Sequence, residues 1–188
     1  NITFGDWWNG GLYGVKTIIG SYSNVKSINS NEDYQYYVTN DNYIGIMRYK
    51  KDTSRKIDLV LDYIENKPIK IVCNNAFINS KINSIIIGDE VERLGQYSFY
   101  NCTSLKTFDF INNNALVSLG YAAFEDCSSL EYIHLPKTIK QIGERCFNNT
   151  GNVLVLFESL DAGNITFGDW WNGGLYGVKT IIGSYSNV

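Results

Sequence analysis

The chain has 188 residues, of which 44% are hydrophobic and 19% charged, and this composition predicts a folded protein of one or two domains. Its formal net charge of −3 argues against nucleic-acid binding, which needs clustered Lys and Arg side chains. No apolar run approaches the roughly 20 residues that a membrane-spanning helix requires, so we expect no membrane insertion.

The first 25 residues return letter for letter as the last 25. The segment NITFGDWWNGGLYGVKTIIGSYSNV occupies residues 1–25 and again residues 164–188. Because divergence does not leave such a run of identities, the duplication is recent or deliberate. The simplest interpretation is one 163-residue unit followed by the opening of the next unit of a tandem array. The alternative is an engineered addition that caps or polymerises the protein.

The duplicated segment is predicted to cap a repeat domain. Residues 158–188 would form the cap of this unit, and residues 1–25 would be the cap of a preceding unit. A cap without its own repeats exposes aromatic side chains, which tend to find a partner. Such a cap could fold onto its own hairpin, dock on another molecule or remain disordered. The candidate interface residues in the two copies are Trp7, Trp8, Trp170 and Trp171.

Residues 26–56 are predicted to form a β-hairpin module. Polar and aromatic residues alternate over residues 34–49 on both sides of the turn sequence Thr-Asn-Asp-Asn at residues 39–42. The next segment, residues 57–64, fits either a strand or a short helical turn.

A shorter repeat fills residues 57–157. Three blocks begin at Ile85, Phe108 and Ile133. Each block has an alternating strand, then a Leu-Gly or Ile-Gly pair, then a Phe after a small residue, and finally a polar-Cys or equivalent pair. The intervals fall between 20 and 29 residues, which is typical of a leucine-rich repeat solenoid. Stacked units of this kind bury one continuous core.

Each position of the repeat has an expected role. Alternation along the strands predicts inward side chains at Ile85, Ile87, Phe108, Phe110, Ile133 and Leu135. The phenylalanines at the shared position, which are predicted to form an aromatic ladder, are Phe77, Phe99, Phe124 and Phe147. The glycines Gly95, Gly120 and Gly143 are expected at sharp turns with positive φ.

The sequence from Leu119 to Pro136 resembles the BspA-type leucine-rich repeat family in its LGYAAFEDCSSL pattern and its closing Leu-Pro. The resemblance covers about half of the chain. It implies a β-rich, right-handed solenoid of about four short units with an N-terminal hairpin and Trp-rich caps. It further implies a secreted or cell-surface protein that adheres to host or neighbouring surfaces, and it supplies no catalytic residues.

Little in the sequence favours catalysis or a cofactor. The four cysteines fit small buried positions of the repeat, and no Cys-x-x-Cys pair suggests zinc. The one histidine, His134, falls on the outward side of a strand and is expected to be a surface residue rather than a general base. The carboxylates show no pairing across a cleft. We therefore expect no enzymatic activity, no metal and no cofactor.

The outward strand positions are the better functional candidates. They form a predicted column on the concave face, made of Ile86, Asp109, His134 and Leu156. Solenoids bind partners on such surfaces, although a solvated face would show the same residues. The sequence therefore predicts an extracellular structural or adhesive tandem-repeat protein that spaces, displays or assembles with copies of itself. The alternative is a recognition module that binds a host protein or glycan on the concave face.

Overall fold

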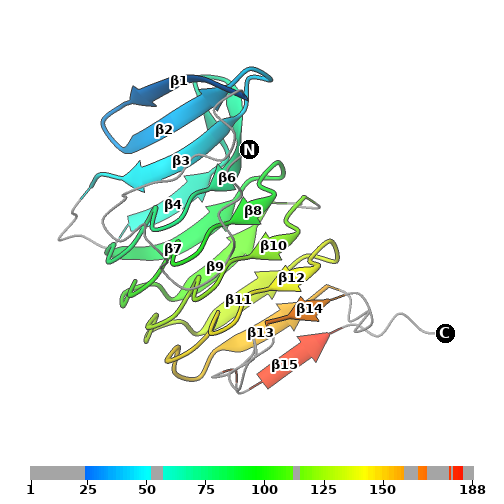
Figure 1. The fold of residues 1–188 in the computed structure, drawn as a ribbon. Helices are drawn as coiled ribbons and strands as arrows, with labels where there is room; N and C mark the ends of the chain where they lie inside the picture. Colours follow the sequence, from blue (N-terminus) through cyan, green and yellow to red (C-terminus); the bar gives the residue numbers. More distant parts are fainter. Residues whose placement is uncertain are drawn as a thin grey trace, which may run out of the picture.

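The computed structural model describes residues 24–51, 57–111, 115–158, 165–168, 178 and 180–183, and the regular elements in them are β-strands. The strands form two sheets, one of nine strands and one of six, and the nine-stranded sheet extends further at the N-terminal end (Figure 1). This architecture confirms the predicted β-rich solenoid. The domain boundaries at residues 25, 56 and 157 remain predictions.

The N-terminal end of the nine-stranded sheet is an antiparallel meander of β1 (Val25–Ser30), β2 (Tyr34–Thr39) and β3 (Ile44–Tyr49). β2 and β3 are the two strands of the expected hairpin, and Asn42 adopts φ 59° in the turn that joins them. β3 then pairs in parallel with β6 (Lys67–Val72), so that Ile44 lies opposite Ile69. The hairpin therefore extends the sheet of the solenoid instead of standing apart from it.

The segment at residues 57–64, which the sequence leaves undecided, is extended. It contains β4 (Ile57–Leu61), at one edge of the six-stranded sheet, and β5 (Tyr63–Ile64). β5 turns back onto β6 through Glu65 and Asn66, which both have positive φ. This tight turn carries the chain from one sheet to the other.

Each following turn of the solenoid gives one strand to each sheet. The six-stranded sheet receives β7 (Ile82–Ile87), β9 (Thr107–Phe110), β11 (Tyr132–Leu135) and β13 (Leu154–Phe157). The nine-stranded sheet receives the two-residue strands β8 (Arg93–Leu94), β10 (Ser118–Leu119) and β12 (Gln141–Ile142). Neighbouring turns pair in parallel in both sheets, which places equivalent repeat positions next to one another.

The predicted aromatic ladder is present in the core. The rings of Phe77 and Phe99 stack at 5.0 Å, those of Phe99 and Phe124 at 5.3 Å, and those of Phe124 and Phe147 at 5.9 Å. Tyr49 of β3 extends the stack, 5.2 Å from Phe77. The hairpin and the repeats therefore share one continuous hydrophobic core.

The structure corrects the role predicted for the repeat glycines. Gly95, Gly120 and Gly143 do not have positive φ. A Cβ atom on Gly120 would lie 2.5 Å from the backbone carbon of Gly95, and one on Gly143 would lie 2.5 Å from that of Gly120. Glycine is required because successive turns approach closely here. The positive φ values lie instead at nearby non-glycine residues such as Tyr97, Ala122 and Arg145.

The second copy of the duplicated segment continues the solenoid. Its strand β14 (Thr166–Phe167) pairs in parallel with β12, and its strand β15 (Thr180–Gly183) pairs in parallel with β13. The segment thus supplies one further strand to each sheet, as every repeat does. The expected Trp-rich caps are not shown, because Trp7, Trp8, Trp170 and Trp171 lie outside the described residues.

Candidate interaction surface

The outward face of the six-stranded sheet carries the column of residues predicted from the sequence. Ile86 lies opposite Asp109, and His134 lies opposite Leu156 in the parallel register. The pairing of β9 with β11 places Asp109 beside His134. The structure thus brings all four predicted residues together, and their function as an interface remains a prediction.

Val60 extends this column by one strand and was missed by sequence reasoning. It lies opposite Ile86, and the two side chains are 54% and 36% exposed. The flanking residues Leu61 and Ile87 are fully buried, so exposure alternates along the strands. The alternation of apolar residues in β4 would have revealed Val60 if residues 57–64 had been assigned as a strand.

An imidazole–carboxylate pair forms the polar centre of the column. Nδ1 of His134 lies 3.2 Å from Oδ1 of Asp109, and the same oxygen accepts a hydrogen bond from the backbone N–H of Phe110 at 2.8 Å. The ring of Phe110 is 4.5 Å from that of His134 and only half-buried, although it was expected to point inward. The arrangement offers one charged group and two flat rings to a partner.

A second outward column runs beside the first and is more polar. Asp58 accepts hydrogen bonds from Ser84 at 2.5 Å and from Asn83 at 3.2 Å. These bonds, first of all the one from Ser84, lower the pKa of the Asp58 carboxyl. Ser84 continues in register to Thr107 and Tyr132. The outward face therefore has an apolar edge at Val60 and Ile86 flanked by polar side chains.

A cluster of aromatic and charged residues lies on the turns that follow the short strands. The rings of Tyr97 and Tyr121 meet edge to face at 5.3 Å. Burial, followed by the neighbouring Tyr121, raises the pKa of Tyr97 to about 12. The buried carboxylate of Glu125 is paired with Arg145 and accepts a hydrogen bond from Asn148 at 2.7 Å. Because its partners come from the next turn, this cluster ties adjacent turns together.

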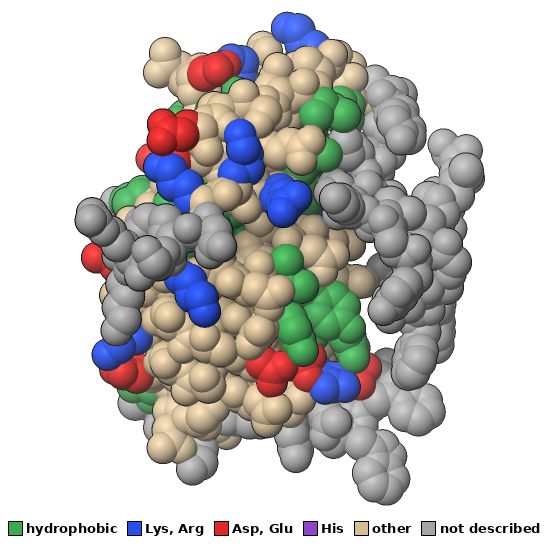
Figure 2. Space-filling model, turned by 90° about the vertical axis from the view of Figure 1, so that its left-hand side faces the viewer, with side chains coloured by type: hydrophobic (Ala, Val, Ile, Leu, Met, Phe, Trp, Pro, Cys, Tyr) green, Lys and Arg blue, Asp and Glu red, His purple; other side chains and the backbone are tan. Residues whose placement is uncertain are grey.

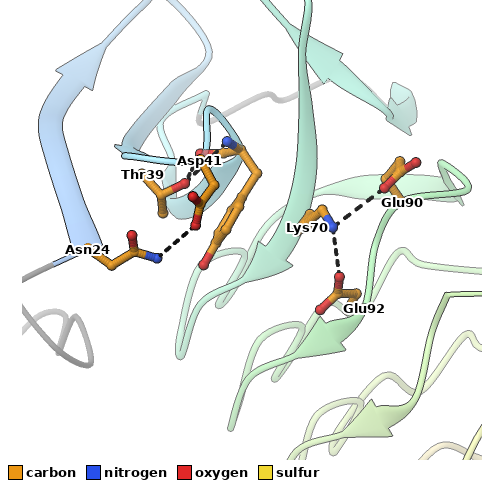
Figure 3. A network of polar contacts seen from close by, with 7 residues as sticks. Asn24, Thr39, Asp41, Lys70, Glu90 and Glu92 are labelled. Carbon is orange, nitrogen blue, oxygen red and sulfur yellow. Dashed lines mark hydrogen bonds and ion pairs between the residues drawn. The ribbon is translucent and has the colours of Figure 1, made fainter.

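The junction between the hairpin and the solenoid is also polar on its outer side. The ammonium group of Lys70 lies 2.9 Å from Glu92 and 3.6 Å from Glu90, and it sits 5.8 Å from the centre of the Tyr43 ring (Figure 3). The hydrogen bond with Glu92 is the largest cause of the raised pKa of Lys70. On the hairpin, the amide of Asn24 contacts Asp41 at 3.5 Å. These contacts link β6 to the loop before β8 and the start of β1 to the turn after β2, so a structural role accounts for them.

The charged side chains form no extended patch of one sign on the side that Figure 2 shows. Lys, Arg, Asp and Glu are interspersed there with uncharged atoms. Among the described residues, no group of three or more His, Cys, Asp or Glu side chains could hold a metal ion. In that same part of the chain, no helix is long and apolar enough to cross a membrane.

All four cysteines are free thiols in the core, where the sequence predicts them. Cys102 and Cys127 donate to the carbonyl oxygens of Phe77 and Phe99 at 3.1 Å. Thr150 takes the same place in the next turn and donates to Phe147 at 2.7 Å. Burial raises the pKa of Cys73 to about 12 and also raises those of Cys127 and Cys146. The thiols of Cys102 and Cys127 thus add hydrogen bonds between adjacent turns.

Comparison with known proteins agrees with this geometry. The profile of the family described as "BspA type Leucine rich repeat region (6 copies)" matches residues 63–159, slightly more than half of the chain. No curated protein matches.

Three solved structures share the fold. A leucine-rich repeat protein from Bacteroides capillosus has a TM-score of 0.58 at 19% identity, over 69% of this chain and 99% of that one. The leucine-rich repeat protein of T. pallidum has a TM-score of 0.56 at 22% identity, over 85% and 84%. A leucine-rich cell surface protein from Faecalibacterium prausnitzii has a TM-score of 0.53 at 18% identity, over 84% and 51%.

Proposed function

Because the chain belongs to the family of BspA-type leucine-rich repeat proteins, we propose that it is an extracellular structural or adhesive protein whose solenoids are displayed and spaced at a cell surface. The similar protein from Faecalibacterium prausnitzii is described as a leucine-rich cell surface protein, which supports this location. The regular solenoid suits such a function, since each turn adds length and outer surface without needing a separate core.

One observation carries the proposal. The last turn of the solenoid and the segment directly before the hairpin have the same sequence. Val188 corresponds to Val25, which is the first residue of β1. One unit can therefore follow another with no added linker, as a spacer or stalk requires.

Surface display is tested on the cells that produce the protein. An antibody against residues 57–158 is expected to label intact cells, and brief protease treatment of those cells should remove the label. Labelling that appears only after the cells are permeabilised would contradict the proposed location.

A second candidate function is recognition of a protein or glycan on the outward face of the six-stranded sheet. The exposed pair Val60 and Ile86 beside Asp109 and His134 favours it, because apolar area next to a few fixed polar groups is typical of binding surfaces. The test compares Ile86→Asp with Ile78→Asp, which alters an exposed isoleucine on a turn outside that sheet. Recognition predicts that only Ile86→Asp weakens adhesion of protein-coated beads to cells. Equal adhesion of both variants argues against it.

A further inference from the structure

The C-terminal end of the solenoid is a defined docking site for a strand pair. On the nine-stranded sheet, the N–H groups of Thr166 and Gly168 donate to the carbonyl oxygens of Lys140 and Ile142 at 2.8 and 3.0 Å. On the six-stranded sheet, β15 pairs with β13 over four successive residues. The site on β12 and β13 therefore recognises its occupant mainly through backbone hydrogen bonds in two parallel sheets.

Side chains and glycine add specificity to this site. Ile165, Phe167 and Val178 pack against the main hydrophobic core. A Cβ atom on Gly168 would lie 2.4 Å from the backbone nitrogen of Glu144, so only glycine permits this approach. Gly168 thus repeats the close contact that Gly143 and Gly120 make one and two turns earlier.

The spacing of the occupant also matches a repeat. Thr180 comes twelve positions after Gly168, the same interval that separates Tyr132 from Gly120. The occupant is therefore a complete repeat unit with one strand for each sheet.

Residues 1–25 contain every feature that holds the occupant in place. Ile2, Phe4, Gly5 and Val15 correspond to Ile165, Phe167, Gly168 and Val178, and residues 17–20 correspond to β15. Identical sequences make identical contacts with the same site. A solenoid that accepts residues 164–188 along the edges of β12 and β13 therefore accepts residues 1–25 equally well.

The two copies are attached at opposite ends of the molecule. The first copy leads into β1, at one edge of the nine-stranded sheet, whereas β14 forms the other edge of that sheet (Figure 1). Residues 164–188 already supply the strands that pair with β12 and β13 of their own chain. The matching site for the first copy is consequently β12 and β13 of a second solenoid.

We propose that residues 1–25 of one chain dock as the last repeat on β12 and β13 of a second copy of this chain, in exchange for that copy's residues 164–188. The contact is head to tail, because the donor and the acceptor are different surfaces, and it therefore extends into a linear assembly. Residues 164–188 of the acceptor chain compete for the same site, and they do so at a high effective concentration because they are attached to it. The exchange is therefore favoured when the binding of residues 164–188 is weakened. This inference deepens the proposed structural function by naming its partner.

The duplication provides a matched experiment in the full chain. Gly168→Val with Ile182→Pro blocks the C-terminal copy, because valine collides with the Glu144 backbone and proline removes an N–H that faces β13 in the parallel register. Gly5→Val with Ile19→Pro makes the same changes in the N-terminal copy, so the two variants have the same composition. Size-exclusion chromatography with light scattering measures the mass of each, and circular dichroism checks folding.

The proposal predicts concentration-dependent oligomers for the variant blocked in residues 164–188. It predicts monomers for the variant blocked in residues 1–25 and for the variant blocked in both copies. A folded monomer in the first case would overturn it. Oligomers that persist when both copies are blocked would also overturn it, because they would form without the donor segment.

A second measurement does not depend on a destabilised variant. Thr3→Cys with Gln141→Cys is expected to trap disulfide-linked dimers and longer species under slow thiol oxidation, because Thr3 corresponds to Thr166, the partner of Gln141. The control, Thr3→Cys with Thr103→Cys, places the second thiol on an exposed turn away from β12. Equal yields from the two would refute the exchange. Both measurements use purified protein, so their failure is distinct from a failure of surface display on cells.

Discussion

At the residue scale, the fold depends on side chains that meet their counterparts in the next turn. The stacked phenylalanines fill the core, and the buried column of Ser80, Cys102, Cys127 and Thr150 lies beside them. The thiol and hydroxyl groups of the last three donate to carbonyl oxygens of the phenylalanines, each of which also accepts a backbone N–H, so these polar groups are satisfied in the interior. Small polar residues are therefore structural at this position.

Truncation of Phe124 tests the aromatic ladder. Phe124 is fully buried between Phe99 and Phe147, so Phe124→Ala removes two ring contacts and leaves a cavity. We expect it to lower the free energy of unfolding by about 3–5 kcal/mol in urea titrations. Ser128→Ala, on an exposed turn, should change it by no more than about 0.5 kcal/mol. Similar urea midpoints for the two variants would show that burial of the Phe124 ring does not stabilise the fold.

The cysteines allow a test of burial by chemistry. A thiol whose pKa is raised stays neutral at pH 8, and only the thiolate reacts with alkylating reagents. Burial raises the pKa of Cys73 to about 12 and also raises those of Cys127 and Cys146. At Cys102, the raising effect of burial on the pKa is outweighed by hydrogen bonds with Cys127 and Ser80, which lower it, but this thiol is also buried in the core. The native protein should therefore react far more slowly than the unfolded protein. Mass spectrometry after iodoacetamide treatment should find four modifications only in denaturant. Rapid native labelling of any one cysteine would place it outside the core.

At the element scale, successive turns pack so closely that glycine is required at one position. Gly120→Ala would place a Cβ atom 2.5 Å from the backbone of Gly95 and is expected to cost about 1–3 kcal/mol through forced separation of the turns. Gly151→Asn is the matched control, because Gly151 has φ +75° and asparagine adopts that conformation readily. Thermal unfolding of both variants should rank Gly120→Ala as the less stable. If Gly151→Asn were the less stable variant, positive φ and not the close approach of turns would be the main reason for glycine in this fold.

Much of the arrangement of strands and turns could be predicted from the sequence, and the predictions that failed did so for physical reasons. The interval between the phenylalanines and the alternation in β7, β9 and β11 predicted both the solenoid and its outward column. The glycine was assigned to positive φ because the sequence does not show how closely one turn approaches the next. The sequence predicts a cap over residues 158–188 and not the strands β14 and β15 within it, although Phe167-Gly168 continues the series of Leu119-Gly120 and Ile142-Gly143.

At the scale of the whole molecule, the described chain behaves as one stack with a shared core from Tyr34 to Val178. The hairpin begins the nine-stranded sheet, and the duplicated segment ends both sheets. A unit that ends with the same segment that precedes its hairpin can be joined to others in series. This arrangement accounts for the exact duplication better than a separate capping domain does.

The central claim is that residues 164–188 form the last repeat of the solenoid, and a designed disulfide tests it most directly. Gln141 and Thr166 are both exposed and lie opposite each other in the parallel register of β12 and β14. Adjacent strands are roughly 4.8 Å apart, within the span that a disulfide bridges. The variant Gln141→Cys with Thr166→Cys should therefore lose two free thiols on mild oxidation while remaining a monomer, as intact mass measurement would show. Two persistent thiols at these positions in a folded protein would contradict the account.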